Sequence, residues 1–510
     1  MLHPVLSQFK LRQPAESDVP NMSPKTRKML LRLALIPIAT VALVASGCTS
    51  SMTTATQSNV PTGSAFLVGT DAPLAAVVSF QVQLLDVELT NGTTTTSTLV
   101  KGTPTVDFAR FNGLQTLVDM NQVPAGTYTG VTFVLGTGTV GYLNIPSGGG
   151  APTIATSPAA FTTSTVTFSL PKSLTIGTNT PPVGLRMDFD LAQSIPVDSN
   201  GNIELNSSGD VTVTPTIDVS TVARTDTGAH IDLLYGSVVT APTSTTEPSS
   251  FTIQGPHGEQ FTINTSSTTE WDGGASLSSL NTDSIVEVAG SLDPADQTLD
   301  ADEVALVTDS KFYARGLVTY VTPASGQATN LDFYVRAVEP SSLADVPLGG
   351  IAQVDITGKE NYGIYWMHNA FTQLLFNSYA LTPGQEIAVG GTDAEATPAT
   401  GTAITVNRIH LESWGYEGTV VNGSQNSGQG LFQMQITGFA GQVVPSTVTV
   451  YLGPACDFRY GFGAFSDLSN GTKVRVVGLL LKNSTNGNLV LLARHIDGLS
   501  FTDTTTAAWQ

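Results

Sequence analysis

Apolar and polar residues alternate along many short stretches of this chain, which is the pattern of β-strands with one buried face. Between residues 80 and 219 the alternating runs are Phe80-Val82-Leu84, Val87-Leu89, Val131-Phe133-Leu135, Val166-Phe168-Leu170, Leu185-Met187-Phe189-Leu191 and Val211-Val213-Ile217-Val219. The change of phase between the first two runs predicts a β-bulge near Leu85. Asn200-Gly201 predicts a type I′ hairpin turn. These strands predict a two-layer β-sandwich over residues 64–224.

Two segments within this region lack the alternation. Residues 91–97 and 146–164 are rich in Gly, Thr, Ser or Pro, so we expect long loops or insertions there. The whole chain has 49 Gly and only 12% charged residues, which favours strands and turns over helices. At 510 residues it is too long for a single core, and we expect three or four domains.

Beyond residue 224 the sequence repeats a pattern about as long as one small domain. Each copy opens with an aliphatic strand that holds a glycine: Gly236, Gly316 or Gly418. A turn followed by a second strand comes later, and an alternating strand closes the copy. The spacing between copies is too long for a solenoid repeat. We therefore expect three small, partly open barrels of the oligonucleotide/oligosaccharide-binding type. Their predicted limits are residues 228–310, 311–411 and 412–502.

The N-terminal region has the features of an export signal. A basic cluster (Lys25, Arg27, Lys28 and Arg32) precedes residues 33–44, which carry no charge. This run is shorter than the ~20 residues of a membrane-spanning helix. It ends in Ala45-Ser46-Gly47-Cys48, which resembles the lipobox of bacterial lipoprotein signal peptides.

That resemblance implies cleavage after residue 47 and a lipid anchor on Cys48, followed by a Ser/Thr-rich linker over residues 48–63. Residues 1–20 are unlike a signal, so Met22 is a candidate start. Thr49 at the next position resembles the sorting pattern for the outer membrane. The alternative is an ordinary signal peptide in which Cys48 is incidental.

Both β-regions resemble families of unknown function. Residues 69–73 (Gly-Thr-Asp-Ala-Pro), 123–128 (Val-Pro-Ala-Gly-Thr-Tyr) and 185–190 (Leu-Arg-Met-Asp-Phe-Asp) resemble the domain of unknown function 4382 of bacterial envelope proteins. That resemblance implies a β-sandwich and export but no catalytic residue. The three repeats look like the domain of unknown function 5666, and the first repeat matches its pattern best. An insertion around residues 360–377 makes the second repeat depart from it.

Charge narrows the possible partners. Removal of residues 1–47, with six basic and two acidic residues, leaves 15 Lys and Arg against 39 Asp and Glu, a net charge of −24. Such a surface repels nucleic acid and anionic lipid headgroups. We find no phosphate loop, dinucleotide fingerprint or Gly-x-Ser-x-Gly elbow, so the sequence predicts no cofactor.

Aromatic residues gather in the insertion of the second repeat. Tyr362, Tyr365, Trp366 and Phe371 could line a ligand groove as stacking platforms. The alternative is that they pack in a core or a short helix.

A few polar groups are candidates for chemistry. Asp188 and Asp190 share one face of a strand and could form an acid/base or cation pair, although we expect that face to meet solvent. The acidic run from Asp293 to Glu303 could collect calcium, but it lacks the order of a known calcium loop, and a solvated hairpin is favoured. Cys456 could be a nucleophile, yet buried packing fits its surroundings better. The histidines are scattered singly, without metal-ligand spacing.

The sequence therefore favours a non-catalytic protein of binding or structural type. We expect it to be lipid-anchored in the bacterial envelope and to present β-domains to a protein or polysaccharide partner. Two alternatives stay open: a glycan-binding adhesin that uses the aromatic insertion, and a hydrolase with a site between domains.

Overall fold

The computed structural model describes residues 61–498. It leaves out residues 73, 75, 93–94, 112–113, 115, 145, 147–149, 179, 181, 199–201, 224–229, 256–259, 283, 294–297, 309–311, 340–342, 344, 365–373, 392–402, 437–445, 460 and 484–485. The proposed export signal, Cys48, the Asn200-Gly201 turn and three of the four insertion aromatics lie outside the described residues. The described part forms nearly all of its regular structure from strands, as predicted. Among these residues, no helix has the length and apolar character needed to cross a membrane.

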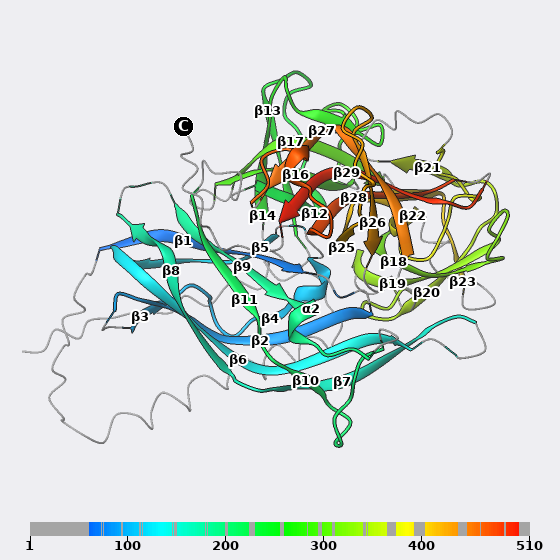
Figure 1. Ribbon diagram of the computed structural model, residues 1–510. Helices are drawn as coiled ribbons and strands as arrows, with labels where there is room; N and C mark the ends of the chain where they lie inside the picture. Colours follow the sequence, from blue (N-terminus) through cyan, green and yellow to red (C-terminus); the bar gives the residue numbers. More distant parts are fainter. Residues whose placement is uncertain are drawn as a thin grey trace, which may run out of the picture. The chain divides into compact units, whose positions relative to one another are not determined.

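Residues 62–223, here called the sandwich, form two sheets (Figure 1). One sheet has the order β11-β9-β1-β5, with strands Ile217–Ala223, Val183–Asp190, Thr62–Ala72 and Thr116–Pro124. The other has the order β10-β7-β6-β2-β3, with strands Val211–Val213, Thr153–Phe161, Gly126–Asn144, Val77–Thr90 and Thr95–Thr98. Two more strands join the second sheet: β4 (Thr105–Asp107) on β2, and β8 (Thr165–Ile176) on β6.

The core of the sandwich is the set of apolar positions that the alternation predicted. Phe80 from β2 and Phe189 from β9 meet across the two sheets, with ring centroids 5.0 Å apart. Both side chains are fully buried, as are Met187, Phe133 and Val131. The predicted bulge is confirmed, because the register of β2 against β6 shifts on both sides of Leu84. Aromatic contacts of this kind add about 0.5–1.5 kcal/mol each to the area that they bury.

Two predictions about the sandwich were wrong. The expected loop at residues 146–164 contains β7, which pairs with the second half of β6, and the expected loop at 91–97 ends in β3. Both strands contain threonine, whose branched side chain fits a pleated sheet as well as a loop. The run from Val211 to Val219 also divides, because β10 and β11 belong to different sheets.

Three small β-domains follow, here called barrel 1, barrel 2 and barrel 3. The strands of barrel 1 are β12 (His230–Thr240), β13 (Ser249–Gln254), β14 (Gln260–Thr265), β15 (Glu270–Asp272), β16 (Ile285–Asp293) and β17 (Thr298–Thr308). Those of barrel 2 are β18 (Phe312–Thr322), β19 (Asn330–Glu339), β20 (Ile351–Asp355), β21 (Asn361–Ile364), β22 (Glu386–Gly391), β23 (Ala403–Thr405) and β24 (Arg408–Glu412). Those of barrel 3 are β25 (Trp414–Val420), β26 (Leu431–Ile436), β27 (Ser446–Arg459), β28 (Lys473–Lys482) and β29 (Leu489–Gly498).

The three barrels share one pattern of strand pairing. In barrel 3 the closed order is β25-β26-β27-β29-β28, with β27 and β29 parallel and the other neighbours antiparallel. Barrel 1 closes in the same way through the parallel pair β14 and β17. In barrel 2 the last strand is divided, so that β23 pairs with β20 and β24 pairs with β22. This is the expected small-barrel architecture, whereas the domain limits stay predictions.

The glycine in the first strand of each barrel has a definite packing role. A Cβ atom on Gly316 would lie 1.8 Å from the backbone oxygen of Tyr334 in the next strand. The corresponding distances are 2.4 Å for Gly236 to the oxygen of Gln254 and 2.4 Å for Gly418 to the oxygen of Gln435. Only glycine permits so close an approach between neighbouring backbones. The repeated glycine therefore allows the first strand to curl into the barrel.

Candidate functional site

Buried charged side chains lie on the outward faces of the barrel strands. In β16 and β28, residues such as Val286 and Val474 are fully buried among the apolar residues of the core clusters. Their neighbours Glu287 and Arg475 point to the opposite face, because side chains alternate along a strand. That outward face is nevertheless buried: Glu287 is 6% exposed and Arg475 is 1% exposed. Another part of the chain must therefore cover each charge.

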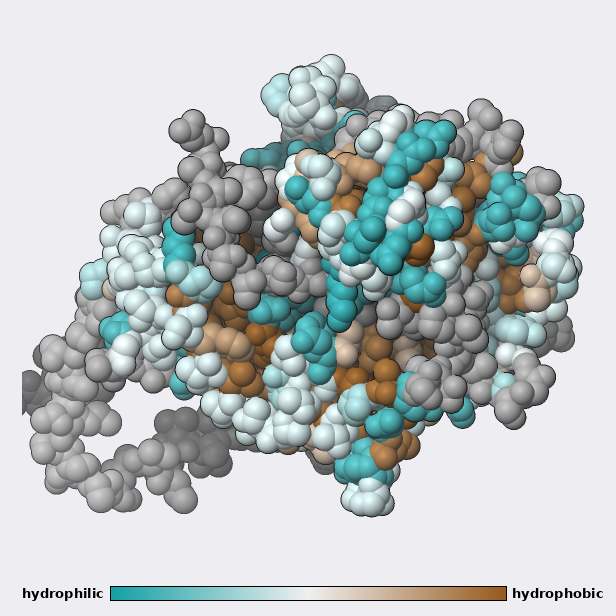
Figure 2. Space-filling model, in the orientation of Figure 1, coloured by the Kyte–Doolittle hydropathy of each residue, from teal (hydrophilic) through white to brown (hydrophobic). Residues whose placement is uncertain are grey.

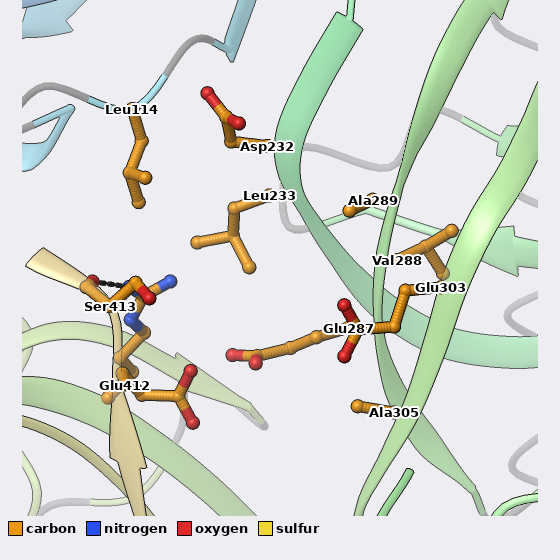
Figure 3. Close-up of a pocket in the computed structure, with 11 residues that line it drawn as sticks. Leu114, Asp232, Leu233, Glu287, Val288, Ala289, Glu303, Ala305, Glu412 and Ser413 are labelled. Atoms are coloured by element: carbon orange, nitrogen blue, oxygen red, sulfur yellow. Dashed lines mark hydrogen bonds between the residues drawn. The ribbon is translucent and has the colours of Figure 1, made fainter. Parts of the chain in front are cut away.

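Barrel 1 and barrel 2 meet at a buried group of charged side chains that includes Glu287. A narrow pocket there is lined by Leu114, Asp232, Leu233, Glu287, Val288, Ala289, Glu303, Ala305, Arg315, Glu412 and Ser413. Figure 3 shows the carboxyl groups of Glu287 and Glu412 directed toward one another, one from each barrel. The pocket offers about 20 Å³ to the centre of a water molecule, which is room for one or two waters.

The two glutamates of this pocket are held differently. Glu287 accepts a hydrogen bond from the hydroxyl of Tyr313 at 2.6 Å. The Oε1 atom of Glu412 has no hydrogen-bond partner among the described residues. Burial, and then the neighbouring Glu287, raise the pKa of Glu412 well above its ordinary value. Burial and Glu287 also raise the pKa of Tyr313, so this hydroxyl stays a donor at any ordinary pH.

Two buried arginines and a third glutamate complete the group. Arg315 contacts Glu386 at 3.2 Å and donates to the backbone oxygen of Ser413 at 3.3 Å. Arg336 lies 3.9 Å from Glu386 and 3.9 Å from the ring centroid of Trp414. Burial alone would lower the pKa of Arg315, but the surrounding glutamates raise it, so the guanidinium stays charged. The carboxyl groups of Glu287, Glu386 and Glu412 thus share two cations, the two arginines.

On the other side of the pocket, barrel 1 meets barrel 3. Arg494 of β29 lies 3.6 Å from Asp232 of β12, whose side chain is fully buried. Glu303 of β17 lines the same pocket, and burial raises its pKa to about 10 even though Arg494 opposes that shift. Acidic neighbours, Asp272 first among them, add to the shift. Here too the acidic groups outnumber the cations.

A second charged group joins barrel 3 to the sandwich. Arg475 of β28 lies 3.4 Å from Asp188 of β9 and 3.3 Å from Glu417 of β25. Arg186 approaches the same oxygen of Asp188 at 3.5 Å. Burial raises the pKa of Glu417 to about 8, although Arg475 acts in the opposite direction. One arginine is therefore shared by carboxyl groups from two different domains.

This arrangement corrects the prediction for the aspartate pair. Met187 and Phe189 do face the core, but Asp188 and Asp190 on the other face are 2% and 7% exposed and do not meet solvent. Asp188 pairs with Arg475 and Arg186. Asp190 accepts a hydrogen bond from the backbone N–H of Gln193 at 2.8 Å and so caps the short helix α2 (Leu191–Ser194). The two aspartates therefore have structural partners.

Glu287 and Glu412 are two buried carboxyl groups that face each other, an arrangement that acid/base catalysts use. A substrate, however, must reach the reacting groups. Ligand sites for small organic molecules typically enclose about 300–1,000 Å³, and the space here admits only water. The arrangement can hold protons and water, and it can fix the two barrels against each other. In this conformation it cannot bind a sugar.

The insertion aromatics are only partly described. Tyr362 is half-buried, and its ring lies 5.6 Å from that of Phe376 in an edge-on contact. Its hydroxyl donates to Glu360 at 3.4 Å. Tyr362 therefore packs against the core of barrel 2. Tyr365, Trp366 and Phe371 lie outside the described residues, so their role as a groove stays a prediction.

The other candidate residues do not come together. The acidic run does form a strand pair, β16 with β17, but Asp293 and Glu303 are buried, so the hairpin is not wholly solvated. Cys456 is half-buried against the core of barrel 3, and burial raises the pKa of its thiol to about 12. Burial also lowers the pKa of His410 to about 3. Within the described residues, no three His, Cys, Asp or Glu side chains could hold a metal ion.

Sequence reasoning missed the buried charged groups, although a signal was present. Glu287 and Arg475 are single charges inside apolar strands of a chain with few charged residues, and they occupy corresponding positions of two repeats. Arg315 and Glu417 each directly precede the opening glycine of a repeat. A lone charge in the middle of such a strand indicates either solvent or a buried partner. The repeated position could have favoured the second choice.

Comparisons with known proteins agree with the families inferred from the sequence. Residues 62–207 match a domain of unknown function (DUF4382), and residues 238–305 in barrel 1 match a second domain of unknown function (DUF5666). A solved structure described as Drosophila Unr CSD456 is 13% identical and covers 52% of this chain and 97% of its own; the TM-score of 0.13 supports no inference from it. No curated protein matches the chain. The chain thus has one segment that matches DUF4382 and, in barrel 1, a second segment that matches DUF5666.

Proposed function

We propose that this chain is a lipid-anchored protein of the bacterial envelope whose β-domains act together as one rigid, non-catalytic module. In this proposal Cys48 carries the lipid, and the residues up to 63 act as a spacer from the membrane. The module presents its surface to a protein or polysaccharide partner. The outer membrane is the proposed location, on the basis of Thr49 after the cysteine.

The observation that carries the proposal is the way in which the domains are joined. The described residues between 61 and 498 belong to one compact unit. Apolar clusters run across the domain limits: Leu479, Leu481 and Leu492 of barrel 3 pack in the core of barrel 2. Phe66 and Val68 of the sandwich pack in the core of barrel 1. Flexible multidomain proteins usually have smaller and more polar contacts between domains.

Hydrogen bonds cross the same limits. The side chain of Gln385 in barrel 2 donates to the backbone oxygen of Leu480 in barrel 3 at 2.9 Å. In return, the hydroxyl of Tyr416 in barrel 3 donates to the backbone oxygen of Gly384 in barrel 2 at 3.0 Å. Both donors are buried. Such bonds fix the orientation of one barrel on the other, because leaving either donor unpaired in the interior would cost about 1–3 kcal/mol.

The surface favours a partner that is not strongly acidic. Without residues 1–47 the chain carries a net charge of −24, which repels polyanions. On the face shown in Figure 2, hydrophilic residues lie between apolar ones over both the sandwich and the barrels. A neutral polysaccharide or a protein with basic groups fits this surface best.

The proposal is tested by crosslinking in cells. The full chain and a Cys48→Ala variant are expressed in the native host, crosslinked and analysed by mass spectrometry, with fatty-acid labelling as the readout of lipidation. We expect the wild type to carry lipid and to capture a specific envelope partner that the variant loses. A wild type without lipid would overturn the anchor. A lipidated wild type that captures no protein would redirect the proposal to glycan binding or to catalysis on a small molecule.

A further inference from the structure

The carboxyl groups at the contact of barrels 1 and 2 exceed the cations that face them. Glu287, Glu386 and Glu412 are 6%, 2% and 3% exposed, and the guanidinium groups facing them are those of Arg315 and Arg336. Three negative charges against two positive ones leave one charge without compensation in a buried place. An uncompensated buried carboxylate is strongly unfavourable, and the usual solution is that one carboxyl binds a proton.

Every strand that packs on this pocket contributes a titratable or charged group. Beyond Arg315 and Arg336, none of these groups is a cation that faces Glu412. These groups are Asp232 from β12, Glu287 from β16, Glu303 from β17, Tyr313 and Arg315 from β18, Arg336 from β19, Glu386 from β22, and His410 together with Glu412 from β24. Asp232 has its own cation in Arg494, at 3.6 Å. The local excess of acid therefore falls on the remaining carboxyl groups.

The geometry indicates which carboxyl holds the proton. Glu386 lies 3.2 Å from Arg315, and Glu287 accepts the hydroxyl hydrogen of Tyr313. Glu412 has neither an ion pair nor a hydroxyl donor among the described contacts, and its Oε1 atom has no hydrogen-bond partner. It faces Glu287 across the contact between the barrels (Figure 3). A protonated Glu412 can donate to Glu287, whereas two ionised carboxylates in this position would repel each other.

We propose that Glu287 and Glu412 form a proton-operated latch between barrel 1 and barrel 2. With one proton shared by the pair, a hydrogen bond joins the two barrels. When the proton leaves, two like charges face each other in a buried space with room for only one or two waters, and the contact between the barrels loosens. The latch is independent of the proposed envelope location and of the lipid anchor.

The direction of the pH effect follows from the folded and opened states. Burial and Glu287 raise the pKa of Glu412 in the closed state, while an opened pair returns to the ordinary value near 4.5. The stabilisation is therefore complete below about pH 4.5 and is lost as the pH rises toward the raised pKa. Over that interval the opening constant, which is the equilibrium constant for separating the contact between barrels 1 and 2, increases by up to about tenfold per pH unit for one proton.

The test is hydrogen exchange of β16 and β24 in the full chain across this pH range, corrected for the intrinsic pH dependence of exchange. Wild type is compared with Glu412→Gln, whose amide cannot ionise and still donates to Glu287. The control, Glu204→Gln, removes one charge from an exposed position. Other buried carboxyl groups act equally in all three proteins. We expect the opening constant of wild type and control to rise with pH up to about tenfold per unit more steeply than that of Glu412→Gln.

Parallel pH profiles in wild type and Glu412→Gln would overturn the latch. If Glu412→Gln does not fold, infrared spectroscopy of the wild type at neutral pH decides the question. A carboxylic-acid band that Glu287→Gln shifts would support a proton shared by the pair. Absence of that band, or a band that the Glu287 variant leaves unchanged, would overturn the proposal.

Discussion

Strands β8 and β9 follow one another in the sandwich and have the same alternating sequence pattern, yet their outward faces differ completely. In β8 the alternate positions Thr165, Thr167 and Ser169 are exposed to solvent. In β9 the alternate positions Arg186, Asp188 and Asp190 are buried. The more strongly charged of the two faces is the buried one. Alternation therefore predicts which side chains share a face, but what covers that face depends on another part of the chain.

The part of the chain that covers β9 is barrel 3, and it contributes charged side chains of its own. Barrel 3 places Arg475 over Asp188, so the outward face of β9 is part of a contact between domains. The two strands also differ in how much stability a substitution on the outward face should cost. A substitution on β8 exchanges one solvated group for another, whereas a substitution at the covered face leaves a charge in a place that water does not reach.

The largest effect is expected from Arg475→Met. The variant leaves Asp188 and Glu417 without the cation that they share, and breaking a buried ion pair in this way costs about 3–5 kcal/mol. The free energy of unfolding, measured with urea, should fall by that amount. Lys172→Met on the exposed part of β8 is the control and should stay within about 0.5 kcal/mol of the wild type. A loss below about 1 kcal/mol for Arg475→Met would mean that the covered face does not depend on this cation.

Two ion pairs of equal length sharpen the comparison. Arg494 and Asp232 lie 3.6 Å apart with the aspartate fully buried, and Arg459 and Asp457 lie 3.6 Å apart with the aspartate 69% exposed. We expect Arg494→Met to lower the free energy of unfolding by about 1.5–3 kcal/mol. Asp457→Asn should lower it by at most about 1 kcal/mol. Equal losses in the two variants would show that burial does not set the strength of these pairs.

Replacement of glycine by alanine should also cost more stability at a covered position than at an open one. In Gly316→Ala the new Cβ meets the backbone oxygen of Tyr334, so the strands of barrel 2 must separate. Such overpacking costs about 1–3 kcal/mol. Gly428, whose nearest neighbour would be 3.5 Å from a new Cβ, is the control, and Gly428→Ala should be nearly neutral. Thermal unfolding of the two variants would measure the difference. A neutral Gly316→Ala would contradict the close packing of β18 on β19.

At mildly acidic pH, Glu417→Gln should change the free energy of unfolding less than the other destabilising substitutions. Burial raises the pKa of Glu417 in the folded protein to about 8 from an ordinary value of 4.5. Its contribution to stability is therefore full below about pH 4.5 and is lost as the pH rises through 8. Wild type and variant should differ least at pH 5 and diverge by pH 9, with the variant losing less stability. Denaturant unfolding at several pH values checks this, and identical pH profiles would contradict the shifted pKa.

Local pattern was sufficient to predict the β-sandwich, the small barrels and the bulge in β2, because each depends on alternation, on a repeated glycine or on a change of phase along one strand. It was insufficient for β7 and β3. Their small and polar residues suit a loop in isolation, and β6 makes β7 a strand by pairing with it. β3 likewise pairs with the preceding strand β2. Neither segment has the alternation of apolar residues that marks a strand, so the local pattern did not reveal the pairing.

The charged contacts between domains were harder to predict because the partner residues lie far apart in the sequence. Asp188 and Arg475 are 287 residues apart, and nothing beside either residue names the other. The prediction that Asp188 meets solvent assumed an uncovered sheet. A single domain would have justified that assumption, but several domains packed together do not. The single charges inside otherwise apolar strands were the one local sign of a buried partner.

The most direct test of the account is calorimetry of the full chain at mildly acidic pH. If buried charges and apolar clusters join the sandwich and the three barrels into one body, the described domains should unfold in one transition, with a calorimetric enthalpy equal to the van't Hoff enthalpy. Arg475→Met should broaden that transition or divide it. Separate transitions in the wild type, one for the sandwich and others for the barrels, would contradict the central claim.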